Sequence, residues 1–331
     1  MLIIDQTQVP QLLPMRTCMD LMADALGALA RGDAALPLRT LMRVPTGAGT
    51  LGLMPAYLGV PPSLGVKLIT VFPGNEGGDL DSHLGAVLLF DPHTGELRAM
   101  IDASSITAIR TAAVSGVATR LLAREDASTL CILGSGVQAE THLEAMSIAR
   151  TITSARIWSR TRANAERLVE RVKARYAFSL EVCATAEAAA RGADIICTTT
   201  ASRVPVLEST WVDDGAHLNV VGASVPTSRE VDSATMRRAR VFVDRRESTV
   251  NESGDFLVPR GEGVINDDHL LAELGELVTG THPGRTSPRD VTLFKSLGLA
   301  IEDVAAAHHV YSSARELGVG LEVALGGRRH A

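Results

Sequence analysis

A Gly-x-Gly-x-x-Ala pattern at residues 134–139 directly follows the apolar run 129–133 and precedes a helix-like stretch. In this context Gly134 permits a tight turn, Gly136 lets the backbone approach a pyrophosphate, and small Ala139 lets the helix pack on the strand. The pattern therefore predicts a dinucleotide site at the helix N-terminus, and the alternative is a plain strand–helix turn that is rich in glycine. The predicted diphosphate-binding residues are Gly134, Gly136, Val137 and Gln138.

The strand-like segment 155–159 comes next and indicates which dinucleotide to expect. Sites for NAD usually place Asp or Glu at the end of this strand, whereas an arginine with a small hydroxyl residue suits the 2′-phosphate of NADP. This chain has Ser159, Arg160 and Thr161 there, and no acid follows until Glu166. The sequence therefore predicts a preference for NADP(H) over NAD(H); the alternative is an ordinary solvated basic turn.

Lys67 is the first candidate for proton chemistry. It lies in the strand-like run 64–72, where it shares a face with Ile69 and Val71. A lysine with apolar neighbours on both sides lies either at a sheet edge or in the interior. Burial would lower the pKa of the ammonium group and suit it to donate a proton near pH 7. The sequence leaves both alternatives open.

Arg110 is the second candidate, in the helix-like segment 104–123, on the same side as Ile106 and Ala113. A guanidinium on an inward-facing stripe needs an anionic partner. That partner is either a structural carboxylate or the carboxylate of a bound substrate, gripped through two N–H groups. Arg39, taken alone, indicates only a surface arginine.

Hydroxyl side chains follow two further strand-like runs. Thr198 and Thr199 follow the run 194–197, and Ser224 follows the run 217–221. Ligands of open parallel sheets bind outside the carboxyl ends of the strands, so both loops are expected near the nicotinamide and the substrate. The alternative role of such loop hydroxyls is capping.

The composition restricts the class of protein. A chain of 331 residues suits two domains, and 46% hydrophobic with 21% charged residues is typical of a soluble globular protein. A net charge of −6 without a basic block gives no support to nucleic-acid binding. No apolar stretch of about 18 residues predicts a membrane span, and the N-terminus does not resemble a signal peptide.

The four cysteines and nine histidines do not predict a metal site. The cysteines lie far apart and form no C-x-x-C pair, which indicates reduced thiols in a cytoplasmic protein. The histidines show no metal-ligand spacing.

Residues 116–305 alternate strand-like and helix-like segments, which predicts an α/β domain with a Rossmann-type doubly wound parallel sheet. Two of the helices are expected at 162–175 and 186–191. The predicted strands are 129–133, 155–159, 180–184, 194–198, 217–221, 241–244 and, near the end, 292–297.

Residues 1–115 differ, because a helix near 20–31 precedes strand-like runs joined by short polar turns such as 91–95. This predicts a mostly antiparallel α+β first domain. Residues 104–123 would form the connecting helix, and the helix-like segment from about 306 would fold back onto the first domain. The predicted limits are 1–115 plus 306–331 for this domain and 116–305 for the dinucleotide domain. The expected strands of the first domain are 51–55, 64–72, 85–91 and 97–102.

Taken together, several stretches make the chain resemble the ornithine cyclodeaminase/mu-crystallin family over nearly its whole length. The matching stretches are 54–57, 66–72, 106–113, 134–139, 220–224, 252–255 and 292–298. The resemblance implies an N-terminal substrate domain completed by the C-terminal helix, a nucleotide domain, and a homodimer formed through the substrate domains.

The resemblance also implies roles for individual residues. Arg39, Lys67 and Arg110 correspond to residues that grip the substrate carboxylate and handle protons, and Ser296 to a residue near the nicotinamide. With the loop residues identified above, the expected nucleotide-binding set is Gly134, Gly136, Val137, Gln138, Ser159, Arg160, Thr161, Thr198, Thr199, Val221, Gly222 and Ser296.

One position departs from the cyclodeaminases of the family. These enzymes, and some dehydrogenases of the family, carry an aspartate for water activation or amine binding where this chain has Ser224. A serine there is similar to mu-crystallin-like ketimine reductases. The resemblance thus implies an NADPH-dependent reductase of cyclic ketimine carboxylates, such as Δ1-pyrroline-2-carboxylate or Δ1-piperideine-2-carboxylate, giving L-proline or L-pipecolate. The alternatives are an ornithine cyclodeaminase, an alanine-type amino-acid dehydrogenase, and a non-catalytic NADPH-binding protein.

Overall fold

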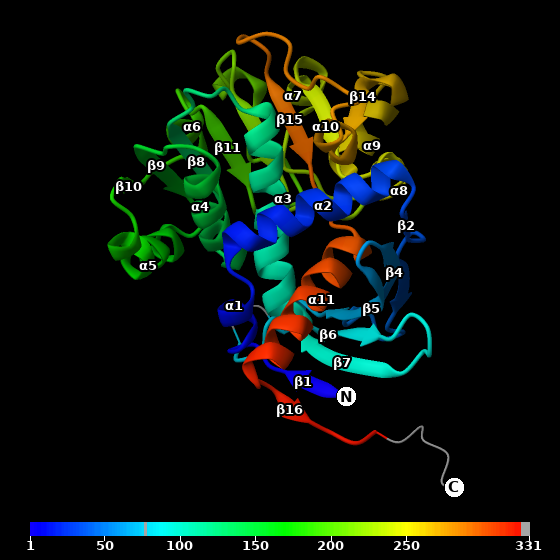
Figure 1. Cartoon of the computed structure of the whole chain (residues 1–331). Coiled ribbons are helices and arrows are strands. Elements are labelled where there is room, and N and C mark those ends of the chain that lie inside the picture. The colour runs from blue at the N-terminus through cyan, green and yellow to red at the C-terminus, as the bar shows by residue number, and fades with distance from the viewer. Residues whose placement is uncertain (76–77, 326–331) are drawn as a thin grey trace, which may run out of the picture. The chain divides into compact units, whose positions relative to one another are not determined.

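The computed structural model describes residues 1–75 and 78–325, and the chain forms two compact units (Figure 1). Unit 1 comprises residues 1–110 and 299–331, and unit 2 comprises residues 111–298. The boundary after Arg110 falls within α3 (Ala103–Leu122). Within the described residues, no helix combines the length and apolar character needed to cross a membrane.

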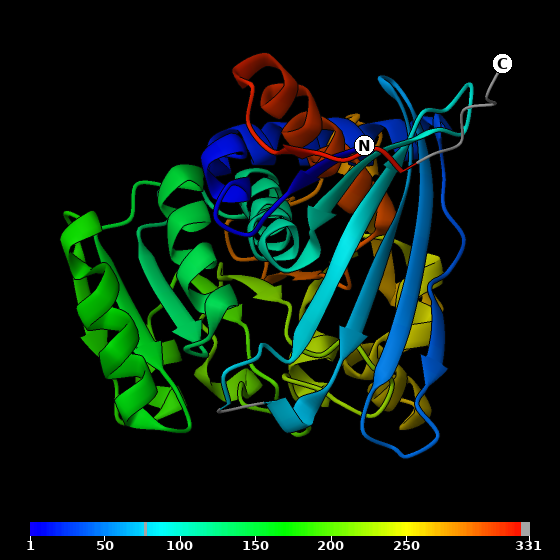
Figure 2. The same cartoon turned by 90° about the horizontal axis from the view of Figure 1, so that it is seen from below.

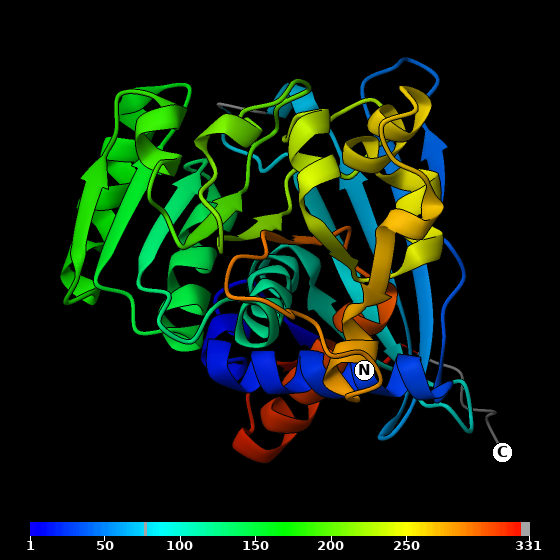
Figure 3. The same cartoon turned by 90° about the horizontal axis from the view of Figure 1, so that it is seen from above.

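Unit 2 is built on an eight-stranded, all-parallel sheet in the order β10-β9-β8-β11-β12-β15-β13-β14. Figure 3 shows β8, β9 and β10 side by side in green. From β8 the chain proceeds first to β9 and then to β11 on the other side, so the strand order reverses there, as in a doubly wound fold. The strands are β8 (Thr129–Leu133), β9 (Ser154–Trp158), β10 (Ser179–Val182), β11 (Ile195–Thr198), β12 (His217–Val220), β13 (Arg240–Val243), β14 (Leu270–Glu273) and β15 (Thr292–Lys295).

The predicted parallel sheet is confirmed, and its seven expected strands lie within two residues of the observed bounds. Strands β11, β12 and β15 are buried along their whole length, which is why they were recognisable as short continuous apolar runs. Strand β14 was missed, because a run this short cannot be told from helix by periodicity. The helices of this unit are α4 (Val137–Ala149), α5 (Arg162–Val172), α6 (Ala186–Ala190), α7 (Ser233–Arg238), α8 (Arg246–Glu252), α9 (Gly254–Gly261) and α10 (Leu274–Val278), with short 3₁₀ turns η2 (Lys173–Arg175), η3 (Ser209–Trp211) and η4 (Asp267–His269).

Unit 1 contains a mostly antiparallel sheet in the order β16-β1-β7-β6-β5-β4-β2, with β3 also pairing with β4 (Figure 2, blue to cyan except for β16, which is red). Only the pairing of β1 with β7 is parallel among the described strands of this sheet. The strands are β1 (Leu2–Ile4), β2 (Ala34–Ala35), β3 (Thr40–Arg43), β4 (Thr50–Gly59), β5 (Pro62–Val71), β6 (His83–Phe90), β7 (Leu97–Asp102) and β16 (Leu321–Glu322).

Strand β4 is longer than the predicted 51–55, because Pro55 does not end it. Strand β3 pairs with β4 as far as Leu53, and β2 pairs with it from Tyr57. Pro55 therefore lies in the gap between two neighbours, where no partner strand requires its missing N–H.

The C-terminal helix α11 (Ala300–Leu317) packs on β4, β5, β6 and α2 (Met15–Arg31). The fold-back of this helix is thus confirmed, but it begins at Ala300 rather than near 306. A Cβ added at Gly65 would lie 3.0 Å from Val304 Cγ2, so the helix approaches the sheet closely at this glycine. The remaining short helices are α1 (Val9–Leu12) and the 3₁₀ turn η1 (Pro73–Asn75).

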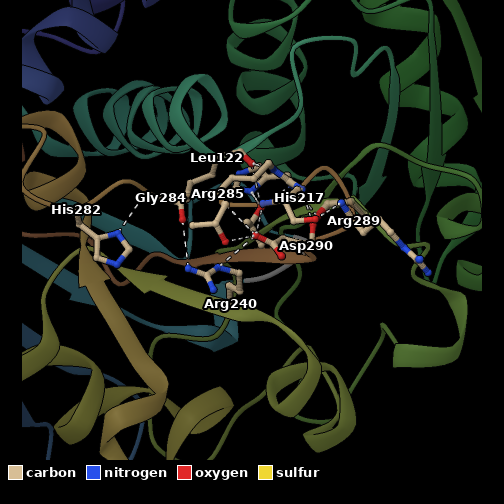
Figure 4. A network of polar contacts seen from close by, with 12 residues as sticks. Leu122, His217, Arg240, His282, Gly284, Arg285, Arg289 and Asp290 are labelled. Atoms are coloured by element: carbon tan, nitrogen blue, oxygen red, sulfur yellow. Dashed lines mark hydrogen bonds and ion pairs between the residues drawn. The ribbon is translucent and has the colours of Figure 1, made fainter.

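A polar network in unit 2 lies at the amino ends of β12 and β15 (Figure 4). Arg285 donates through Nε to the Leu122 carbonyl at 2.6 Å and through Nη2 to Thr292 Oγ1 at 3.0 Å. His217 Nδ1 lies 3.0 Å from the same hydroxyl oxygen. Ligands of parallel sheets bind at the opposite, carboxyl ends, so this network stabilises the fold rather than forming a site.

Two buried histidines predict how stability depends on pH. Burial lowers the pKa of His142 to about 4 and that of His217 to about 3, from an ordinary value of 6.5. The folded protein keeps both neutral while the unfolded chain takes up protons below pH 6.5. The contribution of these histidines to the free energy of unfolding should therefore be fully present above pH 6.5. Below that pH the free energy of unfolding should fall by up to about 1.4 kcal/mol per histidine for each pH unit, as far as pH 4.

Urea unfolding at pH 7.5, 6 and 5 would measure this loss. His217→Gln should flatten the pH dependence, whereas replacing exposed His93 with glutamine should leave the wild-type slope. A free energy of unfolding that stays constant over this range would contradict the prediction.

Candidate active site

Lys67 lies inside unit 1, paired with a carboxylate. Strand β5 is hydrogen-bonded to β4 on one side and β6 on the other, so the sheet-edge alternative for Lys67 is wrong. The side chain is only 3% exposed, and its Nζ lies 2.7 Å from Asp303 Oδ2 on α11. Because α11 covers this face of the sheet, the lysine meets the helix rather than solvent.

Asp303 also binds Arg110, and it joins the two candidate cations into one cluster. Arg110 Nε donates to Asp303 Oδ1 at 2.9 Å, and Arg110 Nη1 donates to Glu302 Oε2 at 2.9 Å. Both carboxylates are fully buried. The anionic partner that Arg110 requires is therefore supplied by the chain itself, by two consecutive residues of α11.

Glu302 and Asp303 were not predicted as site residues. The helix-like pattern predicts a helix only from about residue 306, whereas α11 begins at Ala300 and contains both acids. Two adjacent acids between apolar residues could have indicated them. If such a segment is buried, its charged side chains need partners.

The electrostatics of this cluster favour a proton-carrying lysine. Burial lowers the pKa of Lys67 to about 8, with Arg110 and Arg39 acting in the same direction and Asp303 opposing them. Burial alone would raise the pKa of Asp303, but Arg110 and Lys67 together hold it below its usual value. At neutral pH a charged lysine thus faces an ionised aspartate, and its proton is held less firmly than that of an exposed lysine. Arg39 is half-buried just before β3, and its charge contributes to the lowered pKa of Lys67.

The two glycines of the turn in unit 2 differ in their surroundings. Gly134 has φ +134°, and a Cβ added there would lie 2.4 Å from Thr199 Oγ1. A Cβ added at Gly136 would meet nothing within 4 Å, and this residue is the N-cap of α4. The backbone at Gly136 thus opens onto free space at a helix N-terminus, where a pyrophosphate fits. Exposed Val137 is the first residue of that helix, followed by half-buried Gln138.

The end of β9 joins this turn. Ser135 Oγ donates to Ser159 Oγ at 2.8 Å, which links the glycine-rich turn to the segment that was expected to select the cofactor. Arg160 is exposed and, among the described residues, forms no ion pair, whereas Arg162 pairs with Glu166 at 2.7 Å. Thr161 is the N-cap of α5. Ser159, Arg160 and Thr161 thus follow one another from the end of β9, and the Ser159 hydroxyl contacts the glycine-rich turn. An arginine with small hydroxyl residues is a combination that suits a phosphate group.

The predicted loop hydroxyls differ in what they contact. Thr198 Oγ1 donates to Glu230 at 2.8 Å and Thr199 Oγ1 donates to the Leu133 carbonyl at 3.3 Å, so both hydroxyls are bound within the protein. Ser224 is exposed. Ser296 is buried, and its N–H donates to the Val220 carbonyl at 3.0 Å. A nucleotide contact by the Thr198 or Thr199 hydroxyl would have to share these bonds.

The chain is similar to characterised proteins over nearly its whole length. The model of the ornithine cyclodeaminase/mu-crystallin family matches residues 1–318. The ketimine reductase mu-crystallin of Mus musculus is 43% identical over 282 residues, which are 85% of this chain and 86% of that protein.

Two solved structures share the fold. Thermococcus litoralis Delta(1)-pyrroline-2-carboxylate reductase, in complex with NADH and L-proline, superposes with a TM-score of 0.95 and 39% identity, covering 98% of this chain and 100% of that one. An archaeal alanine dehydrogenase dimer with bound NAD superposes with a TM-score of 0.93 and 33% identity, covering 98% and 99%.

Proposed function

This chain belongs to the ornithine cyclodeaminase/mu-crystallin family, and from that premise we propose that it is an NADPH-dependent reductase of cyclic ketimine carboxylates. The substrates would be Δ1-pyrroline-2-carboxylate or Δ1-piperideine-2-carboxylate, reduced to L-proline or L-pipecolate. The observation that carries the proposal is the buried pair of Lys67 and Asp303, because reduction of an imine needs a group that supplies a proton. The names of the relatives, a ketimine reductase and a pyrroline-2-carboxylate reductase, support it.

In this proposal each residue of the unit 1 cluster has a task. When bound, NADPH supplies the hydride that reduces the C=N carbon. Lys67 keeps the imine nitrogen protonated, directly or through water, since an iminium accepts hydride better than a neutral imine. Asp303 holds the ammonium group in place at 2.7 Å. Arg39 and Arg110 bind the substrate carboxylate, and Arg110 does so while two of its N–H groups remain bound to α11.

We expect NADPH to bind more tightly than NADH, because Arg160 is exposed beside Ser159 and Thr161 at the end of β9. Arg160→Asp should reverse the order, since a carboxylate repels the 2′-phosphate and accepts hydrogen bonds from the ribose hydroxyls of NADH. Fluorescence titration of both cofactors measures the effect. Arg162→Asp, at an arginine already paired with Glu166, is the matched control and should keep the wild-type preference. Equal affinity of the unmodified protein for both cofactors would remove the basis of this assignment.

The reductase is distinguished from its alternatives by one panel of assays. NADPH oxidation should be seen with five- and six-membered cyclic imino acids and not with pyruvate and ammonia. Ornithine with catalytic NAD⁺ should give no appreciable proline and ammonia, because the neutral hydroxyl of Ser224 activates water poorly. Robust ornithine turnover would overturn the reductase in favour of a cyclodeaminase. Turnover of pyruvate with ammonia alone would favour an alanine dehydrogenase, and no turnover at all a non-catalytic NADPH-binding protein.

We also propose a homodimer formed through unit 1. The sheet face turned away from α11 carries apolar side chains, of which Tyr57 is 39% and Leu84 37% exposed. The similar alanine dehydrogenase is described as a dimer. Light scattering should give the mass of two chains, and a monomer at micromolar concentration would overturn the proposal. A cytoplasmic location is proposed as well, in keeping with the four buried thiols, Cys18, Cys131, Cys183 and Cys197.

A further inference from the structure

Glu230, in the loop after β12, is a fully buried carboxylate that accepts four hydrogen bonds. Its Oε2 accepts from Thr198 Oγ1 at 2.8 Å and from the Gly222 N–H at 2.6 Å. Its Oε1 accepts from the N–H and the hydroxyl of Thr200, at 2.6 and 2.7 Å. One side chain thus fixes the loop after β11 and the loop after β12 to each other.

Asp255, at the start of α9, extends this network to β15. One of its oxygens accepts from the Glu230 N–H at 2.7 Å and from the Val231 N–H at 3.1 Å. The other lies 2.9 Å from Lys295 Nζ, which also donates to the Ala223 carbonyl at 2.6 Å. Asp255 and Lys295 are fully buried. Three strand ends of the parallel sheet are therefore tied together by two acids and one lysine.

The loops are also packed without room for side chains. A Cβ added at Gly222 would lie 2.0 Å from the Thr200 carbonyl oxygen and 2.6 Å from Glu230 Oε1. A Cβ added at Gly254 would lie 2.2 Å from the Ser228 carbonyl oxygen. Backbone therefore lies against backbone at these loops, so a change in one of them displaces its neighbour.

Stability alone does not explain such a network. Taking charged groups out of water costs several kcal/mol per ion, and well-packed apolar residues often serve stability as well or better. What a fully bonded polar cluster adds is a fixed geometry for the groups it holds. The groups held here are the loops that carry Gly222, Ser224 and Thr199, at the end of the sheet where ligands bind.

We propose that Glu230 is a positioning residue that fixes the loops after β11 and β12 in the shape that binds the nicotinamide half of the nucleotide. The glycine-rich turn and Arg160 bind the adenosine half through their own contacts. This inference rests on the proposed NADPH binding and adds a residue to that site that touches neither nucleotide nor substrate.

The test is Glu230→Gln, which keeps the shape but replaces one oxygen with an NH₂ group. That group must face the N–H of either Thr200 or Gly222. Neither N–H can accept a hydrogen bond, so one of the two loops loses its backbone hydrogen bond to this side chain. Titration compares NADPH with 2′-phospho-ADP-ribose, which lacks the nicotinamide. We expect about tenfold weaker binding of NADPH, within the range for a buried unpaired donor, and unchanged binding of the fragment.

Asp232→Asn is the matched control. This nearby carboxylate caps α7 by accepting from the Thr235 N–H at 2.8 Å, so its loss should lower stability without changing the ratio of the two affinities. If Glu230→Gln does not fold, Thr200→Val removes a single donor to Glu230 and should shift the ratio in the same direction by a smaller factor.

Equal weakening of both ligands, or no change in either, would overturn the inference. Binding of neither ligand by the unmodified protein would instead show that the proposed function is wrong, and the inference would fall with it.

Discussion

Replacing Lys67 with methionine should lower kcat/KM for a cyclic ketimine by about 10²- to 10⁴-fold, the usual contribution of a positioned proton donor. The affinity for NADPH should stay unchanged, because Lys67 belongs to unit 1 and the glycine-rich turn to unit 2. Steady-state kinetics with a five-membered cyclic imino acid, together with a nucleotide titration, would measure both quantities.

A loss of stability could be mistaken for this catalytic effect. Lys67→Met leaves Asp303 buried with only Arg110 beside it, and breaking a buried ion pair in this way costs about 3–5 kcal/mol. The matched control is the double variant Lys67→Met with Asp303→Asn, which balances the remaining charges of Arg110 and Glu302. It should recover much of the stability and none of the activity. Recovery of turnover in the double variant would show that Lys67 is not the proton donor.

Gly134→Ala should abolish nucleotide binding and also destabilise unit 2. Its φ of +134° is rarely adopted by residues with a side chain, and the added Cβ would lie 2.4 Å from Thr199 Oγ1 and 2.8 Å from the Thr199 carbonyl oxygen. Such strain costs about 1–3 kcal/mol. Thermal unfolding and NADPH titration should therefore both change.

Gly136→Ala provides the comparison within the same turn. An added Cβ meets no protein atom within 4 Å, so stability should stay within about 0.5 kcal/mol of the wild type. NADPH binding should still weaken, because the methyl group occupies the space proposed for the pyrophosphate. Wild-type NADPH affinity in Gly134→Ala, or an equal loss of stability in both variants, would contradict this account of the turn.

The parallel sheet was predictable because its signals are local. Strands such as β11 and β12 are buried on both faces and so stand out as apolar runs between turns. The hairpins of unit 1 were also visible from their short polar turns. The predicted strand 51–55 ended too early, at Pro55. A proline is tolerated inside β4 because of the gap between its partners β2 and β3, and the local sequence does not reveal how these strands pair.

The polar partners of the candidate site were not predictable in the same way. The inward-facing position of Arg110 requires an anion, but nothing near it in the sequence identifies Asp303, which lies 193 positions further along the chain. The hydroxyl of Thr198 was expected near a ligand, and its bond to Glu230 depends on how two separate loops meet. Residue types reveal that a buried charge needs a partner, whereas the identity of the partner is a property of the tertiary fold.

The ion pair between β5 and α11 also has a consequence for the order in which the protein can mature during synthesis. Unit 2 is one continuous segment, so it has all of its strands once residue 298 has left the ribosome. Unit 1 is split, and Lys67 meets its counter-ion only after the final helix has been translated. A nascent or prematurely terminated chain that ends before α11 would thus carry a nucleotide-binding segment without its proton-handling centre. Until α11 has been translated, the hairpins of unit 1 contain a lysine whose charge has no carboxylate partner.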